Sequence, residues 1–334
     1  MPFSSPYAGE REGMTDFGYT MMCEQAGPER LVHDVQAAER AGFDFAVISD
    51  HYFPWLDSQG HSPYAWSVLG AAAYATGSIE LMTYVTCPLF RYHPAVVAQK
   101  AATIQLLADG RFTLGLGAGE NLNEHVVQAG WPPVDVRHDM LTEAIQIIRR
   151  LWTGEYLNFD GDHYDVFSAK LWDIPETLPP IGIAVSGARS CRLAGSLGDV
   201  MIATDPDPKL VERFEDAGGR GKPKVGQIAV SYDTDEKAAV QRAYEQFRWS
   251  AGGWKVNAEL PGPSAFEAAT EYVRQEDIAE LIPCGADVDR HVNAIEPYID
   301  AGFTHVALVQ VGGAQQGAFI EWAERELLPA LRGI

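Results

Sequence analysis

The stretch AAERAGFDFAVIS, residues 37–49, decides the fold. It begins as the end of an amphipathic helix, passes through Gly42 and finishes in the apolar run 45–48. The same order recurs in AAAYATGSIELMTYV (71–85), QLLADGRFTLGLG (105–117), RLAGSLGDVMIAT (192–204) and EPYIDAGFTHVALVQV (296–311). Because a left-handed residue commonly caps a helix, we expect that conformation at Gly42, Gly77, Gly110, Gly198 and Gly302.

The apolar runs in these units are short and continuous, which is typical of parallel strands buried on both faces. The pattern predicts eight strands, at 16–20, 44–49, 80–86, 112–117, 181–185, 199–204, 224–231 and 304–310. Eight alternating strands and helices predict an α/β fold, a (β/α)8 TIM barrel, with a doubly wound open sheet as the alternative. We interpret the segments near 152–180 and 249–263 as insertions within a single domain, residues 1–334.

Composition narrows the class of protein. The chain of 334 residues is 46% hydrophobic and carries a net charge of −21, from 25 Lys and Arg against 46 Asp and Glu. Such a surface repels nucleic acid and anionic membranes, so we expect a small-molecule substrate instead. No signal-peptide pattern or membrane-length apolar run is present, and the four cysteines form no CxxC pair. These features predict a cytoplasmic protein, and the scattered histidines predict no metal site.

In a barrel of this kind the chemistry lies where the strands end. Asp50, His51 and Trp55 follow the strand of the deciding stretch. His51 is a candidate general base oriented by the neighbouring Asp50, and Trp55 could cover a flat cofactor. A structural loop histidine and a core tryptophan are the alternatives. Glu24 and Glu120 follow other strands, where a desolvated carboxyl would have a raised pKa and could donate a proton, unless both are solvated loop acids.

Two further loops are candidates for holding phosphate. GLGAGENLNE (115–124) is rich in glycine, and VSGARS (185–190) opens a predicted helix whose first amides could bind an anion. Close packing of strand and loop, and a plain helix cap at Ser186, explain the same patterns without a ligand.

Several motifs together resemble one family. They are FGYTMMCEQ (17–25), SDHYFPW (49–55), CPLFRYHPAVVAQKAATI (87–104), GLGAGENLNE and LWTGEYLNFDGDHY (151–164). They resemble the luciferase-like superfamily, and within it the coenzyme F420-dependent glucose-6-phosphate dehydrogenases. The resemblance implies a homodimeric barrel, coenzyme F420 as the cofactor across the carboxyl-terminal rim, and a cis peptide between Tyr84 and Val85.

The resemblance also implies roles for individual residues. His51 corresponds to the base that takes the substrate hydroxyl proton, Trp55 to the residue that stabilises the intermediate, and Glu120 to the acid that protonates the reduced deazaflavin. Glu24 corresponds to a carboxylate of the substrate pocket. The expected coenzyme contacts are Asp50, Tyr84, Val85, Cys87, Ala118, Gly119, Asn123, Ser186, Gly187, Arg189 and Ser190. Cys87 and Ala118 stand where threonines are typical, and Ser186 where glycine is typical, so backbone groups would make some of these contacts.

The substrate pocket departs from the family. Two lysines and one arginine hold the sugar phosphate there, whereas this chain has Asp207, Asn257 and Leu281 at those positions. Each lost charge-assisted bond is worth about 1.5–3 kcal/mol, which predicts an uncharged hydroxyl substrate, an alcohol or a free sugar. Lys209 and Lys255 are the alternative cations.

We expect three residues to line the substrate pocket: Thr204, Trp254 and Leu281. Three other functions stay open for the chain. They are reduction of a carbonyl, imine or enone by reduced F420, an FMN-dependent monooxygenase, and a non-catalytic flavin-binding barrel.

Overall fold

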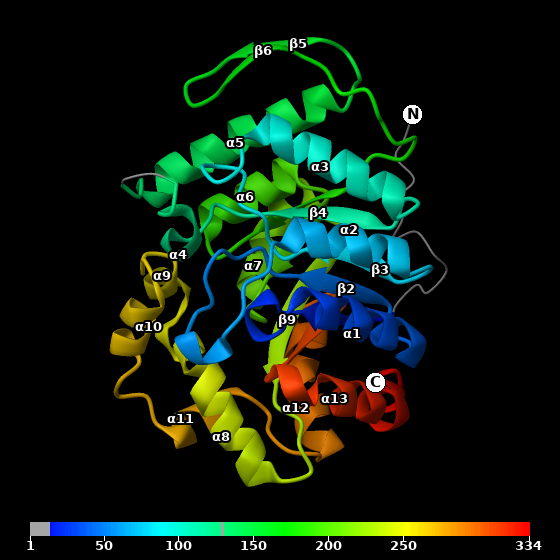
Figure 1. The fold of residues 1–334 in the computed structure, drawn as a ribbon, viewed down its shortest axis with the longest axis vertical. Coiled ribbons are helices and arrows are strands. Elements are labelled where there is room, and N and C mark those ends of the chain that lie inside the picture. Colours follow the sequence, from blue (N-terminus) through cyan, green and yellow to red (C-terminus); the bar gives the residue numbers. More distant parts are fainter. Residues whose placement is uncertain (1–13, 128–129) are drawn as a thin grey trace.

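The computed structural model describes residues 14–127 and 130–334. Eight parallel strands close a barrel in the order β1-β10-β9-β8-β7-β4-β3-β2, in which each strand pairs with its neighbours along the chain (Figure 1). They are β1 (Asp16–Met21), β2 (Phe45–Ile48), β3 (Glu80–Thr83), β4 (Phe112–Leu116), β7 (Ile181–Ala184), β8 (Val200–Ala203), β9 (Lys224–Val230) and β10 (His305–Gln310). All eight predicted strands are confirmed, and closure excludes the open sheet.

Helices surround the barrel, because each predicted crossover returns the chain over the outside of the sheet. The long ones are α1 (Pro28–Ala41), α2 (Ala65–Ala75), α3 (Pro94–Leu107), α5 (Val134–Leu151), α6 (Ala188–Leu197), α8 (Glu236–Phe247) and α12 (Val288–Asp300). Shorter ones are α4 (Asn121–Glu124), α7 (Pro208–Phe214), α13 (Gln316–Trp322) and α14 (Leu328–Leu331). Within the two described ranges, no helix combines the length and apolarity needed to cross a membrane.

Two apolar layers stabilise the barrel. Its interior is filled by Phe45, Val47, Met82, Val200, Ile202, Val225 and Ala307. A larger layer joins the outer faces of the strands to the helices, with Phe17, Tyr19 and Phe112 among its buried residues. Gly18 on β1 leaves room for the Phe45 ring, because a Cβ there would collide with it.

The predicted helix caps are right at three glycines and wrong at two. Gly42, Gly110 and Gly302 have φ of 88°, 86° and 90°, in the left-handed region. Gly77 does not, since the chain leaves α2 through the extended Thr76 and Glu39 Oε1 then accepts the amide of Gly77 at 2.8 Å. Gly198 has φ −88° and ψ 157°, and glycine serves there because a Cβ would crowd the Ala194 carbonyl.

Both insertions lie outside the barrel strands. The first contains an antiparallel hairpin, β5 (Leu157–Asp160) and β6 (Asp165–Ala169), which lies beyond α5 at the top of Figure 1. A groove of about 460 Å³ beneath it is lined by Leu151, Tyr156 and Trp172. None of the carboxyl-terminal rim residues lines that groove.

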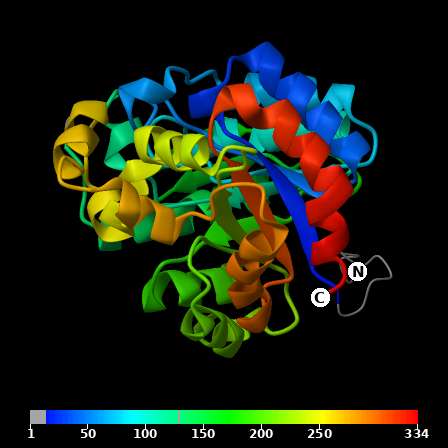
Figure 2. The ribbon, with the colours of Figure 1, turned by 90° about the horizontal axis from the view of Figure 1, so that it is seen from below.

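The second insertion is longer than predicted. It continues past residue 263 through η4 (Arg248–Gly252), α9 (Trp254–Asn257), α10 (Pro263–Ala269) and α11 (Gln275–Leu281). These helices gather with α8 on one side of the barrel, coloured yellow to orange in Figure 2. The segment stays folded because it has its own apolar core, in which Phe266 of α10 and Ile278 of α11 pack with Trp55 and Phe247.

Candidate active site

His51 lies just beyond β2 between carboxylates that come from two other strand ends. Its Nδ1 atom is 2.8 Å from Oε1 of Glu24, in the turn η1 (Cys23–Gln25) that follows β1. Its Nε2 atom is 3.5 Å from Oε2 of Glu120, which follows β4. Ser49 donates a hydrogen bond to the other Glu24 oxygen at 2.7 Å. The closed barrel thus brings together three of the residues expected at its rim.

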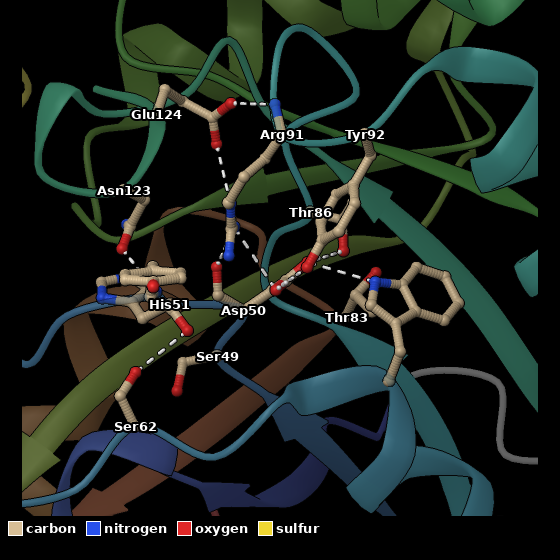
Figure 3. A network of polar contacts seen from close by, with 12 residues as sticks. Ser49, Asp50, His51, Ser62, Thr83, Thr86, Arg91, Tyr92, Asn123 and Glu124 are labelled. Atoms are coloured by element: carbon tan, nitrogen blue, oxygen red, sulfur yellow. Dashed lines mark hydrogen bonds and ion pairs between the residues drawn. The ribbon is translucent and has the colours of Figure 1, made fainter. Parts of the chain in front are cut away.

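The acid that orients His51 is Glu24, so the expectation that Asp50 does so was wrong. Neighbouring residues of an extended segment point to opposite sides, and the Asp50 carboxylate turns away from the imidazole. It accepts hydrogen bonds from Thr86 at 2.7 Å and Tyr92 at 3.0 Å (Figure 3). Trp66 donates a further one at 3.1 Å. Protein donors therefore hold the buried Asp50 carboxylate on the side away from His51.

Burial and mutual charge shift the pKa of all three groups. Burial lowers the pKa of His51, but the charges of Glu24 and Glu120 and the hydrogen bond to Glu24 outweigh it and raise the pKa to about 9. Burial raises the pKa of Glu24, yet its interactions with His51 and Ser49 hold it below the ordinary value. Burial raises the pKa of Glu120 to about 7 despite the nearby His51. Two groups that can exchange protons near neutrality therefore face each other.

Asn123 links the segments that carry these two groups. Its Nδ2 donates to Oε2 of Glu120 at 3.1 Å, and its Oδ1 accepts the amide of Tyr52 at 2.8 Å. The side chain is buried and both of its ends are used within the protein. In the structure this residue, which was predicted as a coenzyme contact, supports the acid.

Aromatic rings cover the other side of His51. The Trp55 ring centroid lies 4.9 Å from that of His51, and Trp55 stacks on Trp249 with centroids 4.1 Å apart and planes 7° apart. Phe266 meets Trp55 edge-on at 5.0 Å. Trp249 was not predicted as a site residue, because the sequence pattern placed it at the start of an insertion. The aromatic residues of the run FRWSAGGW (247–254) around it were the available signal.

The residues expected to line the substrate pocket are all exposed side chains. Trp254 at the start of α9 is 42% exposed, and Leu281 at the end of α11 is 58% exposed. Thr204 follows β8 and is exposed, and its carbonyl accepts a hydrogen bond from Tyr298. The tryptophan that the structure brings against Trp55 is Trp249.

Two positions where the family has cations have structural partners here. Asp207 is the N-cap of α7 and accepts the amide of Lys209 at 2.9 Å. Asn257 is buried and donates to the carbonyl of Trp249 at 3.2 Å. These contacts give both residues a role in holding the chain, independent of any phosphate.

The loops after β3 and β4 fit a flat coenzyme at the barrel mouth. The peptide between Tyr84 and Val85 is cis, as predicted. Gly119 has φ 78° and packs against Cys87, where a Cβ would collide with the sulfur. Tyr84, Val85 and Ala184 form the top of the interior apolar layer, and Ala118 packs on the outer one. An apolar floor with close-packed backbone above it suits an aromatic ring system.

The start of α6 fits an anionic group. The first helical hydrogen bond is from the amide of Cys191 to the carbonyl of Gly187, so the amides of residues 188–190 precede it. Ser190 Oγ accepts the amides of Ser186 at 3.1 Å and Gly187 at 3.2 Å, which shapes the loop. Arg189 is held by Asp135 at 2.7 Å and Asp139 at 2.6 Å. Helix amides of this kind bind phosphate.

The chain is similar to known proteins over most of its length. Residues 14–305 match the family described as Luciferase-like monooxygenase. The chain is 40% identical to the F420-dependent hydroxymycolic acid dehydrogenase of Mycobacterium tuberculosis, over 85% of this chain and 80% of that protein. It is 36% identical to the F420-dependent glucose-6-phosphate dehydrogenase of Nocardia farcinica, over 96% and 99% of the two chains.

A similar solved structure is that of an F420-dependent secondary alcohol dehydrogenase in complex with an F420-acetone adduct. Its TM-score is 0.87 at 29% identity, and the match covers 96% of this chain and 99% of the other.

Proposed function

This chain belongs to the luciferase-like monooxygenase family, and we propose that it oxidises the hydroxyl group of an unphosphorylated alcohol or sugar. It is an F420-dependent dehydrogenase, as its relatives over nearly the whole chain are. The observation that carries the proposal is His51, held between Glu24 and Glu120 at the mouth of the barrel.

The chemistry divides between the coenzyme and the protein. F420 would be held by the loops after β3 and β4 and by the start of α6, and when bound it would supply the hydride acceptor, C5 of its deazaflavin ring. His51 accepts the hydroxyl proton through Nε2, because Nδ1 faces Glu24. The Glu24 carboxylate then stabilises the imidazolium, and Glu120 holds a proton for the reduced coenzyme. Trp55 and Trp249 exclude water from one side of His51.

An uncharged substrate is supported by the positions that replace the family's cations. A desolvated phosphate needs cations or several aimed amides. Asp207 would repel it, Asn257 is engaged with the Trp249 carbonyl, and Leu281 is apolar. The relatives act on glucose 6-phosphate, hydroxymycolic acid or a secondary alcohol. Proteins similar to this chain therefore include enzymes for phosphorylated and for unphosphorylated substrates.

Reduction by reduced F420 is a second candidate, favoured by the charge of His51. With the pKa of His51 raised to about 9 and that of Glu120 to about 7, the imidazole carries the proton between these values. A protonated His51 can donate to the oxygen of a carbonyl, or to an imine or enone, in the reverse reaction. The FMN-dependent monooxygenase and the non-catalytic barrel are disfavoured, because the relatives that match most of the chain are F420-dependent dehydrogenases.

The experiment begins with titration of the purified protein with F420 and FMN, for which we expect F420 to bind more tightly. Secondary alcohols, glucose and glucose 6-phosphate are then compared by the loss of the oxidised F420 absorbance. We expect turnover with a neutral alcohol or sugar and negligible turnover with glucose 6-phosphate. Efficient glucose 6-phosphate turnover would mean that Lys209 or Lys255 holds the phosphate, and tighter FMN binding would favour the monooxygenase.

We also propose the homodimer that the family resemblance implies and a cytoplasmic location. Apolar side chains on adjacent helices support a subunit contact: Tyr74 on α2 and Val96, Leu106 and Leu107 on α3 are all at least 45% exposed. Sedimentation equilibrium tests the dimer, and a mass equal to one chain of 36.5 kDa would exclude it.

A further inference from the structure

Arg91 lies behind the catalytic groups, in the loop between β3 and α3, and its side chain is only 7% exposed. Its Nη2 atom donates to the backbone carbonyl of Asp50 at 2.7 Å. Its Nε atom donates to Oε1 of Glu124 at 3.2 Å, and its own amide donates to Oε2 of Glu124 at 2.9 Å. Figure 3 shows the guanidinium stretched between the two acceptors.

The two segments that Arg91 joins are those that carry the proton-exchanging groups. The Asp50 carbonyl belongs to the peptide that leads into His51, so its direction sets how His51 leaves β2. Glu124 is the last residue of α4, and its amide donates to the carbonyl of Glu120 at 3.2 Å. One residue from a third loop therefore fixes both anchor points.

We propose that Arg91 is a positioning residue that sets the separation between the His51 imidazole and the Glu120 carboxylate, and through it their exchange of protons. The inference rests on the proposed function of that pair. It extends the proposal to a side chain that touches neither group, and acts on both through Asp50 and Glu124.

The requirement for arginine follows from charge and shape together. The Asp50 and Glu124 side chains are fully buried, and Arg91 is the cation that contacts both among the described residues. The other nearby cation, Lys100, lies over the Tyr92 ring, with its Nζ 3.4 Å from the ring centre. A lysine at position 91 would keep the charge, but its single nitrogen cannot donate in two directions from a rigid plane as the guanidinium does.

Asn123 also connects the segment after β2 with the segment after β4, through its hydrogen bonds to Tyr52 and Glu120. Loss of the Arg91 bridge should therefore loosen the His51–Glu120 pair without separating it. At a larger separation Glu120 raises the pKa of His51 less, and His51 lowers the pKa of Glu120 less. The pKa of His51 should therefore fall and that of Glu120 should rise. This narrowing of the interval between the two values is a signature that a merely structural arginine does not have.

The test compares Arg91→Lys with the matched control Arg111→Lys. Arg111 is a part-buried arginine that also donates to several backbone carbonyls, those of Ala73, Thr76 and Ile79, at the opposite end of the barrel. We expect Arg91→Lys to lower kcat about 10- to 100-fold, less than the roughly 10²- to 10⁴-fold that the general base itself contributes, with KM changed less. The bell-shaped pH profile should narrow. Arg111→Lys should lower the melting temperature and leave the profile in place.

A second measurement needs no turnover. The imidazole of His51 is titrated by NMR in wild type and in both variants, and its pKa should fall in Arg91→Lys alone. Unchanged kcat, pH profile and His51 titration in Arg91→Lys would overturn the inference, even if the variant melts earlier. If the wild-type protein turned over none of the tested alcohols and sugars while the pKa of His51 still fell in Arg91→Lys, the result would count against the proposed function and not against the role of Arg91. If Arg91→Lys does not fold, Glu124→Gln, which keeps one acceptor oxygen, should lower kcat in the same direction.

Discussion

The Nδ1 atom of His51 lies 2.8 Å from Oε1 of Glu24, and this contact leaves only Nε2 to face the substrate. A carboxylate on Nδ1 holds the ring orientation and the tautomer, as it does for other functional histidines. The same contact, with the charge of Glu120, raises the pKa of His51 against the effect of burial. The contact with Glu24 thus decides which nitrogen reacts, and Glu24 and Glu120 together set the pH at which it does so.

Replacement of His51 by alanine should lower turnover about 10²- to 10⁴-fold, because the hydroxyl proton loses its acceptor. Affinity for F420 should change little. Steady-state kinetics with the best alcohol of the panel checks this, with His33→Ala on the exposed side of α1 as the control. Wild-type turnover in His51→Ala would rule out the role.

The pH dependence of kcat/KM should be bell-shaped, with limbs near the values of about 7 and about 9 for Glu120 and His51. Oxidation needs one proton, on Glu120 while His51 is neutral, and reduction needs the same proton on His51. Both directions therefore use the singly protonated pair and share one profile.

Glu24→Gln removes a charge that raises the pKa of His51, so the upper limb of this pH profile should move to lower pH. A stationary limb would show that Glu24 does not tune His51.

Glu120→Gln should remove the lower limb of that profile, because the amide keeps the shape of the side chain but does not titrate. Turnover should fall while F420 still binds. The upper limb should also move down, since the charge of Glu120 contributes to the raised pKa of His51. The same pH series on the variant measures all three effects, and an unaltered lower limb would count against Glu120 as the acid.

The roles of two tryptophans in the second insertion can be distinguished by their effects on KM. Trp249→Ala removes the ring stacked on Trp55 at 4.1 Å, which covers one side of His51. We expect KM for the alcohol to rise about 2- to 10-fold, the change that corresponds to the loss of one ring contact of about 0.5–1.5 kcal/mol with the substrate. Trp254→Ala changes a side chain that is 42% exposed and should have a smaller effect. A larger rise in KM for Trp254→Ala would place that residue in the substrate pocket, as the sequence predicts.

Stability should depend on the charge of His305, at the start of β10. Burial lowers its pKa to about 4. Between that value and the unfolded value of about 6.5 the unfolded chain binds the proton and the folded chain does not, so stability falls as the pH falls through this window. The loss should reach about 3 kcal/mol at the acidic end. Urea denaturation across this range checks it, and His305→Gln should show a shallower slope.

The sequence by itself determined eight alternating parallel strands and helices, because apolar runs such as residues 45–48 are typical of strands buried on both faces. A closed barrel and an open sheet both provide such burial, and the closed order of the strands decided between them. The sequence also placed the candidate groups, since polar residues directly after such strands, Glu24, His51 and Glu120 among them, must meet at one rim. The cis peptide at Tyr84–Val85 was predicted from the family resemblance alone, and the structure contains it.

Only the tertiary structure decided which of these groups pair. Asp50 is the nearest acid to His51 in sequence, yet alternation along the extended chain turns its carboxylate toward Thr86 and Tyr92. Glu24 reaches His51 because β1 pairs with β2 in parallel, and Trp249 reaches Trp55 because the second insertion folds back over the rim. Side-chain direction and the distance between strand ends depend on closure and packing, which no local pattern of residues contains.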